Sequence, residues 1–187
     1  MTTTDAAGLR ALQKPLKDRY RQDPEAARVV GRAVARLTGD GITATVDGWA
    51  GPVRAGFHPA TGGDGSDACS ADLMLQALAA CAGVTLRSVA TVMGVDLRDA
   101  SVIVEGRWDA RGTLGVDRET PVGLTDVTVT FAFDTDADEA TADRLVALAE
   151  RYCVIAQTLR TPPAVEVRRA AAAATTRRGH HGALDQR

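Results

Sequence analysis

The residues that decide the fold run from Ser70 to Gly94 and read SADLMLQALAACAGVTLRSVATVMG. Placed on a helix, the stretch is apolar on almost every side, and Gly94 suits the left-handed cap of a helix C-terminus. Ser70 is a candidate N-cap, and the Asp72 carboxylate is favourable in a first turn. The sequence therefore predicts a buried helix over about 70–94. A sheet on one side cannot enclose such a helix, so we expect a second helix or a second protomer over it.

The same stretch is long enough to span a bilayer, but five polar residues interrupt it: Gln76, Thr85, Arg87, Ser88 and Thr91. We therefore expect a buried helix of a soluble protein and no membrane partner. The first residues lack a basic region followed by an apolar run, so we expect no secretory signal and a cytoplasmic location. A net charge of −2 and a pI of about 5.9 give no reason to expect nucleic-acid binding.

Six β-prone segments surround this helix: 29–36, 42–46, 53–57, 100–108, 124–133 and 164–168. The first three precede the helix, and a glycine-rich turn at 39–41 separates the first two, which predicts an antiparallel meander. The segment 124–133 alternates apolar and polar residues, as a half-buried strand does. A second helix is predicted over 136–152, from its acidic first turn and apolar stripe.

The predicted order of elements is βββ-α-ββ-α-β. Strands and helices do not alternate strictly, so the predicted class is α+β. The chain has 187 residues, 45% of them hydrophobic, which suits one domain. We expect that domain at 28–168, after a polar and partly helical arm at 1–27. Residues 169–187 are Ala-rich and then basic, and we expect them to form a disordered tail.

Three cysteines, Cys69, Cys81 and Cys153, are the candidates for chemistry. In a reducing cytoplasm, paired thiols are more often catalytic or redox-active than structural. Composition alone equally allows each of them to be a small buried hydrophobe, and periodicity does not say that Cys81 and Cys153 meet. Cys69 precedes the central helix, a position that can lower the pKa of a thiol.

Other chemistries have weak support in the sequence. It contains no CxxC or HxxxH pair, and His58 is isolated. It has no GxSxG nucleophile motif, and its glycine-rich loop at 62–65 does not follow a parallel strand–helix unit. We therefore expect neither a metal nor any other cofactor.

Three stretches resemble the OsmC/Ohr superfamily, which comprises osmotically inducible protein C and the organic hydroperoxide resistance proteins. They are the loop and helix around Cys81 (72–87), the segment 90–94 with its following strand, and the segment 151–159 around Cys153. The resemblance covers about 28–168. It implies an OsmC/Ohr-like fold, in which a curved antiparallel sheet wraps around two central helices in an intertwined homodimer.

The resemblance also implies a chemistry, the thiol-dependent reduction of organic hydroperoxides or hydrogen peroxide in the stress response. The Cys81 thiolate would attack the O–O bond and become a sulfenic acid. Cys153 would then condense with it to a disulfide, and an external dithiol would reduce that disulfide. The alternative is a catalytically weak member of the same fold that binds a small ligand or responds to redox conditions.

Such an attack needs a thiolate, whereas burial in an apolar helix raises the pKa of a thiol. In the family, an arginine from the N-terminal meander offsets this cost, held by an acidic residue at the start of the helix. The matching acidic residue here is Asp72. For the arginine, both Arg36 and Arg54 remain open, and Arg36 is the first choice.

Overall fold

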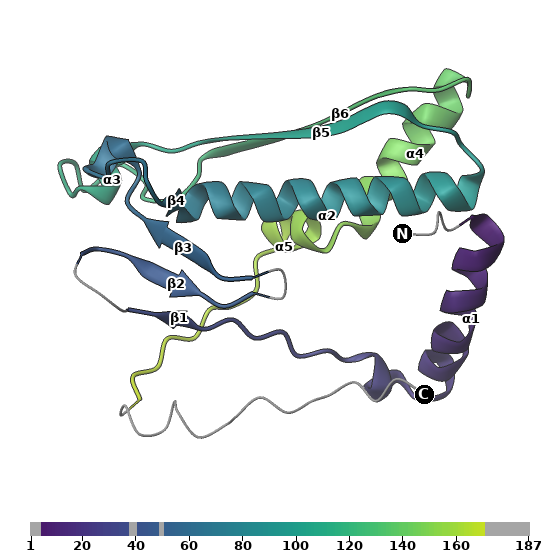
Figure 1. Cartoon of the computed structure of the whole chain (residues 1–187), viewed down its shortest axis with the longest axis horizontal. Helices are drawn as coiled ribbons and strands as arrows, with labels where there is room; N and C mark the ends of the chain where they lie inside the picture. Colours follow the sequence, from purple (N-terminus) through teal and green to yellow (C-terminus); the bar gives the residue numbers. More distant parts are fainter. Residues whose placement is uncertain (1–4, 38–40, 49–50, 171–187) are drawn as a thin grey trace.

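The computed structural model describes residues 5–37, 41–48 and 51–170 of the chain (Figure 1). Its elements, in chain order, are α1 (Ala6–Gln22), a 3₁₀ turn (Pro24–Ala27), β1 (Ala35–Arg36), β2 (Ala44–Val46), β3 (Val53–Gly56), a second 3₁₀ turn (Pro59–Thr61), β4 (Ala68–Cys69), α2 (Ser70–Met93), β5 (Arg98–Arg107), α3 (Ala110–Thr113), β6 (Asp126–Asp134), α4 (Glu139–Tyr152) and α5 (Val154–Arg160). Helices and strands do not alternate strictly, so the predicted α+β class is confirmed.

The central helix α2 forms where the sequence predicts it. Gly94 ends it with φ 70°, a left-handed conformation that glycine adopts without strain, which confirms the predicted cap. The N-cap is Cys69 and not Ser70, and it makes no side-chain capping bond. The helix packs against the long β5–β6 ribbon and against α4 and α5 (Figure 1).

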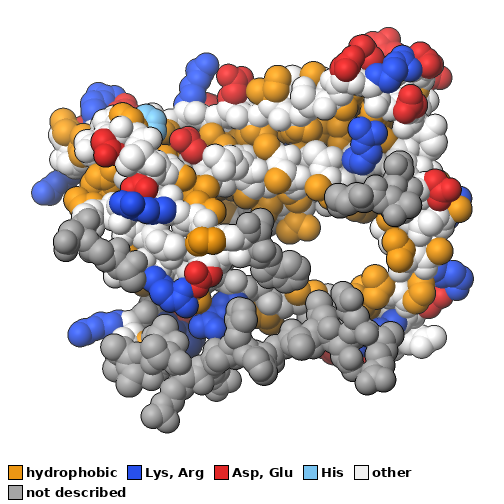
Figure 2. All heavy atoms as spheres, viewed as in Figure 1, with side chains coloured by type: hydrophobic (Ala, Val, Ile, Leu, Met, Phe, Trp, Pro, Cys, Tyr) orange, Lys and Arg blue, Asp and Glu red, His pale blue; other side chains and the backbone are white. Residues whose placement is uncertain are grey.

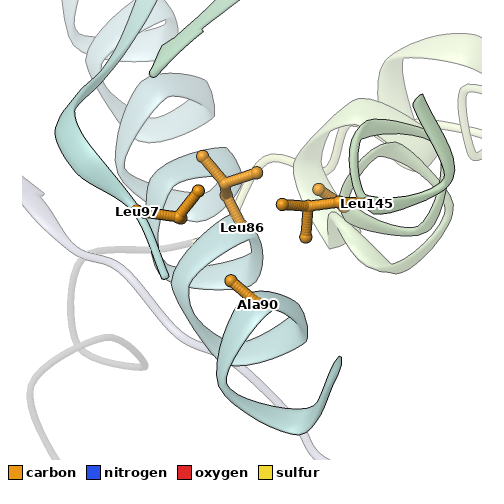
Figure 3. Close-up of a cluster of buried hydrophobic side chains, with 5 residues drawn as sticks. Leu86, Ala90, Leu97 and Leu145 are labelled. Carbon is orange, nitrogen blue, oxygen red and sulfur yellow. The ribbon is translucent and has the colours of Figure 1, made fainter. Parts of the chain in front are cut away.

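The core consists of two buried clusters along one face of α2. Its buried residues recur every fourth position: Leu78, Ala82, Leu86 and Ala90. Leu86 and Ala90 form the first cluster together with Leu97 and with two residues of α4, Leu145 and Ala149. Figure 3 shows Leu145 reaching from α4 towards Leu86. Leu78 and Ala82 form the second cluster together with Cys153, so the core extends to the end of α4.

The opposite face of α2 is exposed in the single chain. Only 22% of its most apolar part is buried, and the Val84 side chain is 73% exposed. Among the described residues, α2 is also the one helix long and apolar enough to cross a membrane. Its regular packing on α4 and β5 is that of a core helix. The chain thus supplies the second helix that the sequence analysis expects and still leaves half of α2 uncovered.

The strands form two separate sheets. The first has the order β1-β2-β3-β4, with β1, β2 and β3 antiparallel and β4 parallel to β3. The predicted meander is therefore confirmed, but its first strand is short: residues 29–34 belong to no strand, and β1 consists of Ala35–Arg36. The β5–β6 ribbon is antiparallel over 98–107 and 126–134, with an irregularity between Arg98 and Ser101.

One prediction at the ends of the chain differs from the structure. The strand expected at 164–168 is wrong: this segment belongs to no sheet in the described part of the chain. Its side chains find no apolar cover, since Val165 is 85% and Val167 90% exposed. In the N-terminal arm, α1 is the predicted helix, and none of its residues is buried. The predicted disordered tail lies, from residue 171 onwards, outside the described residues.

The contact between α4 and α2 can be tested at Leu145, which is 0% exposed. Leu145→Ala removes three buried carbon atoms from the first cluster and should lower the free energy of unfolding by about 2–5 kcal/mol. Chemical denaturation measures this change. Val116→Ala, at a side chain that is 72% exposed, is the control and should change it by less than about 0.5 kcal/mol. Equal effects of the two substitutions would contradict the assignment of the core.

Candidate redox site

The side chains of Cys81 and Cys153 pack together in the second core cluster, where each thiol influences the pKa of the other. Cys81 lies in the middle of α2 and is half-buried, whereas Cys153 follows α4 and is fully buried. Both are free thiols and belong to the second core cluster. The structure therefore brings together the two cysteines that the sequence leaves as separate candidates.

Cys153 is a one-residue joint between two helices. It is the C-cap of α4 and the N-cap of α5, with extended backbone angles of φ −75° and ψ 106°. Its N–H donates to the Glu150 carbonyl at 3.3 Å, and its carbonyl accepts from the Gln157 N–H at 3.0 Å. The chain turns at this joint, so the first turn of α5 and its free N–H groups face the two thiols.

Those N–H groups favour the thiolate of Cys81. Burial raises the pKa of Cys81, but the Ile155 N–H, the Cys153 thiol and the Val154 N–H all donate to its sulfur. The Thr85 hydroxyl, which lies 2.7 Å from the Cys81 carbonyl oxygen, contributes in the same direction. The donors outweigh burial, so the pKa of Cys81 lies below its ordinary value.

The same geometry keeps Cys153 protonated. Burial raises the pKa of Cys153; a hydrogen bond from the Ala156 N–H opposes this, but the negative charge of Cys81 raises the pKa further. The two thiols thus differ in kind, one favoured as a thiolate and the other as the thiol that donates to it. This is an arrangement for attack by Cys81 followed by reaction with Cys153.

The other predicted site residues lie elsewhere in the chain. Arg36 pairs with Asp47 between neighbouring strands, and Arg54 pairs with Asp67 at 3.0 Å. Asp72 is exposed in the first turn of α2. Within the described residues, none of the three predicted supporting side chains is among the main influences on the pKa of Cys81.

Cys69 faces a separate cavity of about 410 Å³ at the start of α2. The walls include His58 and Trp108, whose rings meet edge to face at 5.4 Å. Cys69 is thus placed apart from the paired thiols. Among the described residues, no three His, Cys, Asp or Glu side chains cluster to hold a metal ion.

The donors of α5 are not predicted from the sequence, because the second helix is expected to end at residue 152 and no helix is expected after Cys153. The segment Val154–Arg160 is nevertheless a regular helix of seven residues. A sequence signal exists, since Ala156, Gln157, Leu159 and Arg160 are good helix formers. What the sequence could not show is that a helix restarts after a single non-helical residue.

A largely apolar cavity of about 650 Å³ adjoins Cys153. Its walls come from α2, β6, α4 and α5, and include Leu78, Val129, Phe131, Val146 and Leu159. Glu150 and Arg160, which form an ion pair, add a charged edge. The cavity could receive a hydrocarbon group beside the buried thiol.

Comparison with known proteins agrees with the fold. Residues 63–168, more than half of the chain, match the family described as OsmC-like protein. No curated protein matches the chain in sequence. Among solved structures, an OsmC-like protein from Mycoplasma pneumoniae superposes with a TM-score of 0.60 and 16% identity, over 72% of this chain and 89% of its own.

Two further structures are similar. A hypothetical protein from Aquifex aeolicus VF5 has a TM-score of 0.55 and 14% identity, over 72% of this chain and 90% of its own. An organic hydroperoxide resistance protein OsmC from Legionella pneumophila has a TM-score of 0.51 and 22% identity, over 72% and 93%. At these identities the likeness shows the fold alone.

The opposite pKa shifts of the two thiols predict how Cys81 reacts with an alkylating reagent. The thiolate is the reactive form, so the alkylation rate of Cys81 should rise through a midpoint below that of a free cysteine thiol. Cys153→Ala removes one donor to this thiolate and should raise the midpoint by about one pH unit, the size of one hydrogen bond to a charged group. Mass spectrometry of the labelled peptide measures the midpoint, with Cys69→Ala as control. An unchanged midpoint in Cys153→Ala would show that the two thiols do not interact.

Proposed function

The chain belongs to the OsmC-like protein family, and from this premise we propose that it is a cysteine-based peroxidase. Its substrates would be organic hydroperoxides or hydrogen peroxide, and its location the cytoplasm. The observation that carries the proposal is the packing of Cys81 against Cys153 in the second core cluster, at the first turn of α5. It joins an activated thiolate to the second thiol that the reaction needs.

In the first step, the Cys81 thiolate attacks one peroxide oxygen and the O–O bond breaks. The other oxygen takes up a proton and leaves as an alcohol, or as water from hydrogen peroxide. Cys81 is thereby oxidised to a sulfenic acid, and the peroxide is reduced. The donors around Cys81 in the reduced protein support this step, because they favour the form that attacks.

In the second step, Cys153 attacks the sulfenic sulfur and water leaves, which gives a disulfide. The thiolate of Cys81 is one cause of the raised pKa of Cys153. A sulfenic acid carries no such charge, so oxidation of Cys81 makes deprotonation of Cys153 easier. An external dithiol then reduces the disulfide by two thiol exchanges and becomes a disulfide itself.

We also propose a homodimer in which a partner covers the exposed face of α2. Its support is the Val84 side chain, which is 73% exposed on a helix of high apolar content. Asp72 and Arg36 remain proposed supporting residues. Within one chain Arg36 pairs with Asp47. Action of this arginine on Cys81 would therefore require the Arg36 of a second protomer, or a rearrangement of the β1–β4 sheet.

The alternative is a protein that binds a small apolar ligand or responds to oxidation, with little turnover. The cavity of about 650 Å³ beside Cys153 favours this alternative. So does the pairing of both candidate arginines with carboxylates of their own chain. Turnover separates it from the proposed peroxidase.

We expect the protein to consume cumene hydroperoxide or hydrogen peroxide when a small dithiol is supplied. Cys81→Ser should abolish this activity, because serine forms no comparable nucleophile at neutral pH. Cys153→Ser should leave a sulfenic acid at Cys81 that a dimedone-type reagent can trap. The measurements are peroxide loss over time and mass spectrometry of the trapped peptide. Activity of the native protein no greater than that of Cys81→Ser would refute the proposed function.

The dimer is tested separately, by light scattering at micromolar concentration. Val84→Glu places a charge on the uncovered face of α2 and should convert the dimer to monomer, because a buried unpaired charge is costly. Val116→Glu, on an exposed loop, should leave the dimer intact. A native protein that is monomeric at these concentrations would exclude the arrangement.

A further inference from the structure

The first turn of α5 can serve Cys81 only while α5 keeps its orientation on α4. A single residue, Cys153, joins the two helices, and α5 has no buried residue of its own. The joint by itself leaves the direction of α5 open, since one extended residue can rotate about two backbone angles. Packing of Ile155 and Ala156 on the second core cluster restricts that direction, and side-chain contacts across the joint restrict it further.

Two side chains of α5 reach back across the joint to the same residue, Glu150. The Gln157 amide donates from Nε2 to the Glu150 carbonyl oxygen at 2.9 Å, in a half-buried position. The Arg160 guanidinium pairs with the Glu150 carboxylate, and both of these groups are exposed. Gln157 and Arg160 are three residues apart, so they lie on one face of α5.

The two contacts are unequal. Exposed ion pairs contribute little, because water competes for both charges. The Glu150 carbonyl belongs to the last turn of α4, where carbonyl groups lack partners within the helix. The Glu150 carbonyl also accepts a hydrogen bond from the Cys153 N–H at 3.3 Å. The bond from Gln157, at 2.9 Å, is the shorter of the two. Of the two contacts, the amide is the stronger link between the helices.

We propose that Gln157 is a positioning residue that holds the first turn of α5 against Cys81. It touches neither thiol; it acts through the Val154 and Ile155 N–H groups, which donate to the Cys81 sulfur. Loss of the Gln157 bond lets α5 tilt away, lengthens those donor contacts and leaves the thiolate less stabilised. The effect on turnover rests on the proposed peroxidase function, whereas the effect on Cys81 itself does not.

Few titratable groups surround Cys81 in the described part of the chain. The β5–β6 ribbon presents apolar side chains to this cluster, namely Val102, Val104, Val129 and Phe131. The joint adds Cys153, and the adjoining cavity adds Glu150 and Arg160. The remaining charges on the helices packed here are Asp72 and Arg87 of α2 and Glu139, Asp143, Arg144 and Arg151 of α4, which lie on exposed positions. A neutral substitution at Gln157 changes none of these charges.

The test is the pH dependence of Cys81 alkylation in the full chain, read by mass spectrometry. Gln157→Met keeps the length of the side chain and removes its donor without adding a charge. We expect the alkylation rate of Cys81 at neutral pH to fall about tenfold, the size of one hydrogen bond to a charged group, and its midpoint to rise. Gln157→Glu, which at neutral pH can no longer donate, should do the same. Circular dichroism checks that both variants are folded.

Two control variants separate positioning from general weakening of α5. Thr158→Ala removes a hydroxyl that donates to the Val154 carbonyl within α5 and does not reach α4. Arg160→Gln removes the exposed ion pair. Both should leave the midpoint of Cys81 within about 0.2 pH units of the native value, a change of less than twofold in the ionisation constant.

Three results would overturn the inference: no change in Gln157→Met, a shift confined to Gln157→Glu, or a shift in Thr158→Ala as large as that in Gln157→Met. An unchanged midpoint in Gln157→Met would show that Gln157 does not position α5. A shift confined to Gln157→Glu would assign the effect to charge, and an equal shift in Thr158→Ala would assign it to the stability of α5. Peroxide turnover is measured in parallel. A shifted midpoint in a protein that consumes no peroxide would uphold the positioning role and refute the proposed function.

Discussion

The burial of one face of α2 is the constraint on which the rest of the molecule depends. The helix is apolar almost throughout, and its buried residues recur every four positions from Leu78 to Ala90. This stripe joins the β5–β6 ribbon to α4 in one core, with Leu145 between them (Figure 3). Because α4 is docked along α2, the residue that follows α4, Cys153, meets the middle of α2. That meeting places Cys153 beside Cys81 and leaves the opposite face of α2 bare.

A thiolate in the middle of a helix receives no backbone hydrogen bond from its own helix, whose N–H groups are already used in the i→i−4 pattern. Backbone donors must come from another element. The family resemblance points to an arginine, and in the described chain Arg36 and Arg54 are each paired with a carboxylate. The structure instead offers the first N–H groups of α5, which carry no net charge and need no counter-ion. Backbone donors are also fixed by the fold, so the thiolate costs less to solvate when it forms.

The surface of the molecule shows where the sequence is less informative. In Figure 2, apolar side chains are spread over the exposed faces of the elements and not confined to the interior. The pattern of α2 predicts a helix covered all round, and the chain covers half of it. The pattern at 164–168 predicts a strand, but Val165 and Val167 are exposed. The periodicity of a sequence indicates which side chains are suited to burial. It does not indicate which element or partner buries them.

The local pattern of the sequence predicts the α+β class, the central helix with its Gly94 cap, and strands that match β5 and β6. The family resemblance identifies Cys81 and Cys153, but their contact depends on how α4 docks, which no local pattern contains. The helix α5 is not predicted, because the helical pattern is expected to end just before Cys153. The donors of the site thus lie in an element that the predicted order of strands and helices omits.

The shortness of α5 ties the site to its scaffold. A helix of seven residues is too short to be stable alone in water, so tertiary contacts must maintain it. Those contacts are the packing of Ile155 and Ala156 on the second core cluster, the Gln157 bond to Glu150, and the hydrogen bonds to the Cys81 sulfur. The hydrogen bonds that lower the pKa of Cys81 therefore also cap the start of α5, and each partner stabilises the other. A change in the charge of Cys81 alters the stability of α5 by the same free energy with which α5 alters the pKa of Cys81, because the two effects are linked.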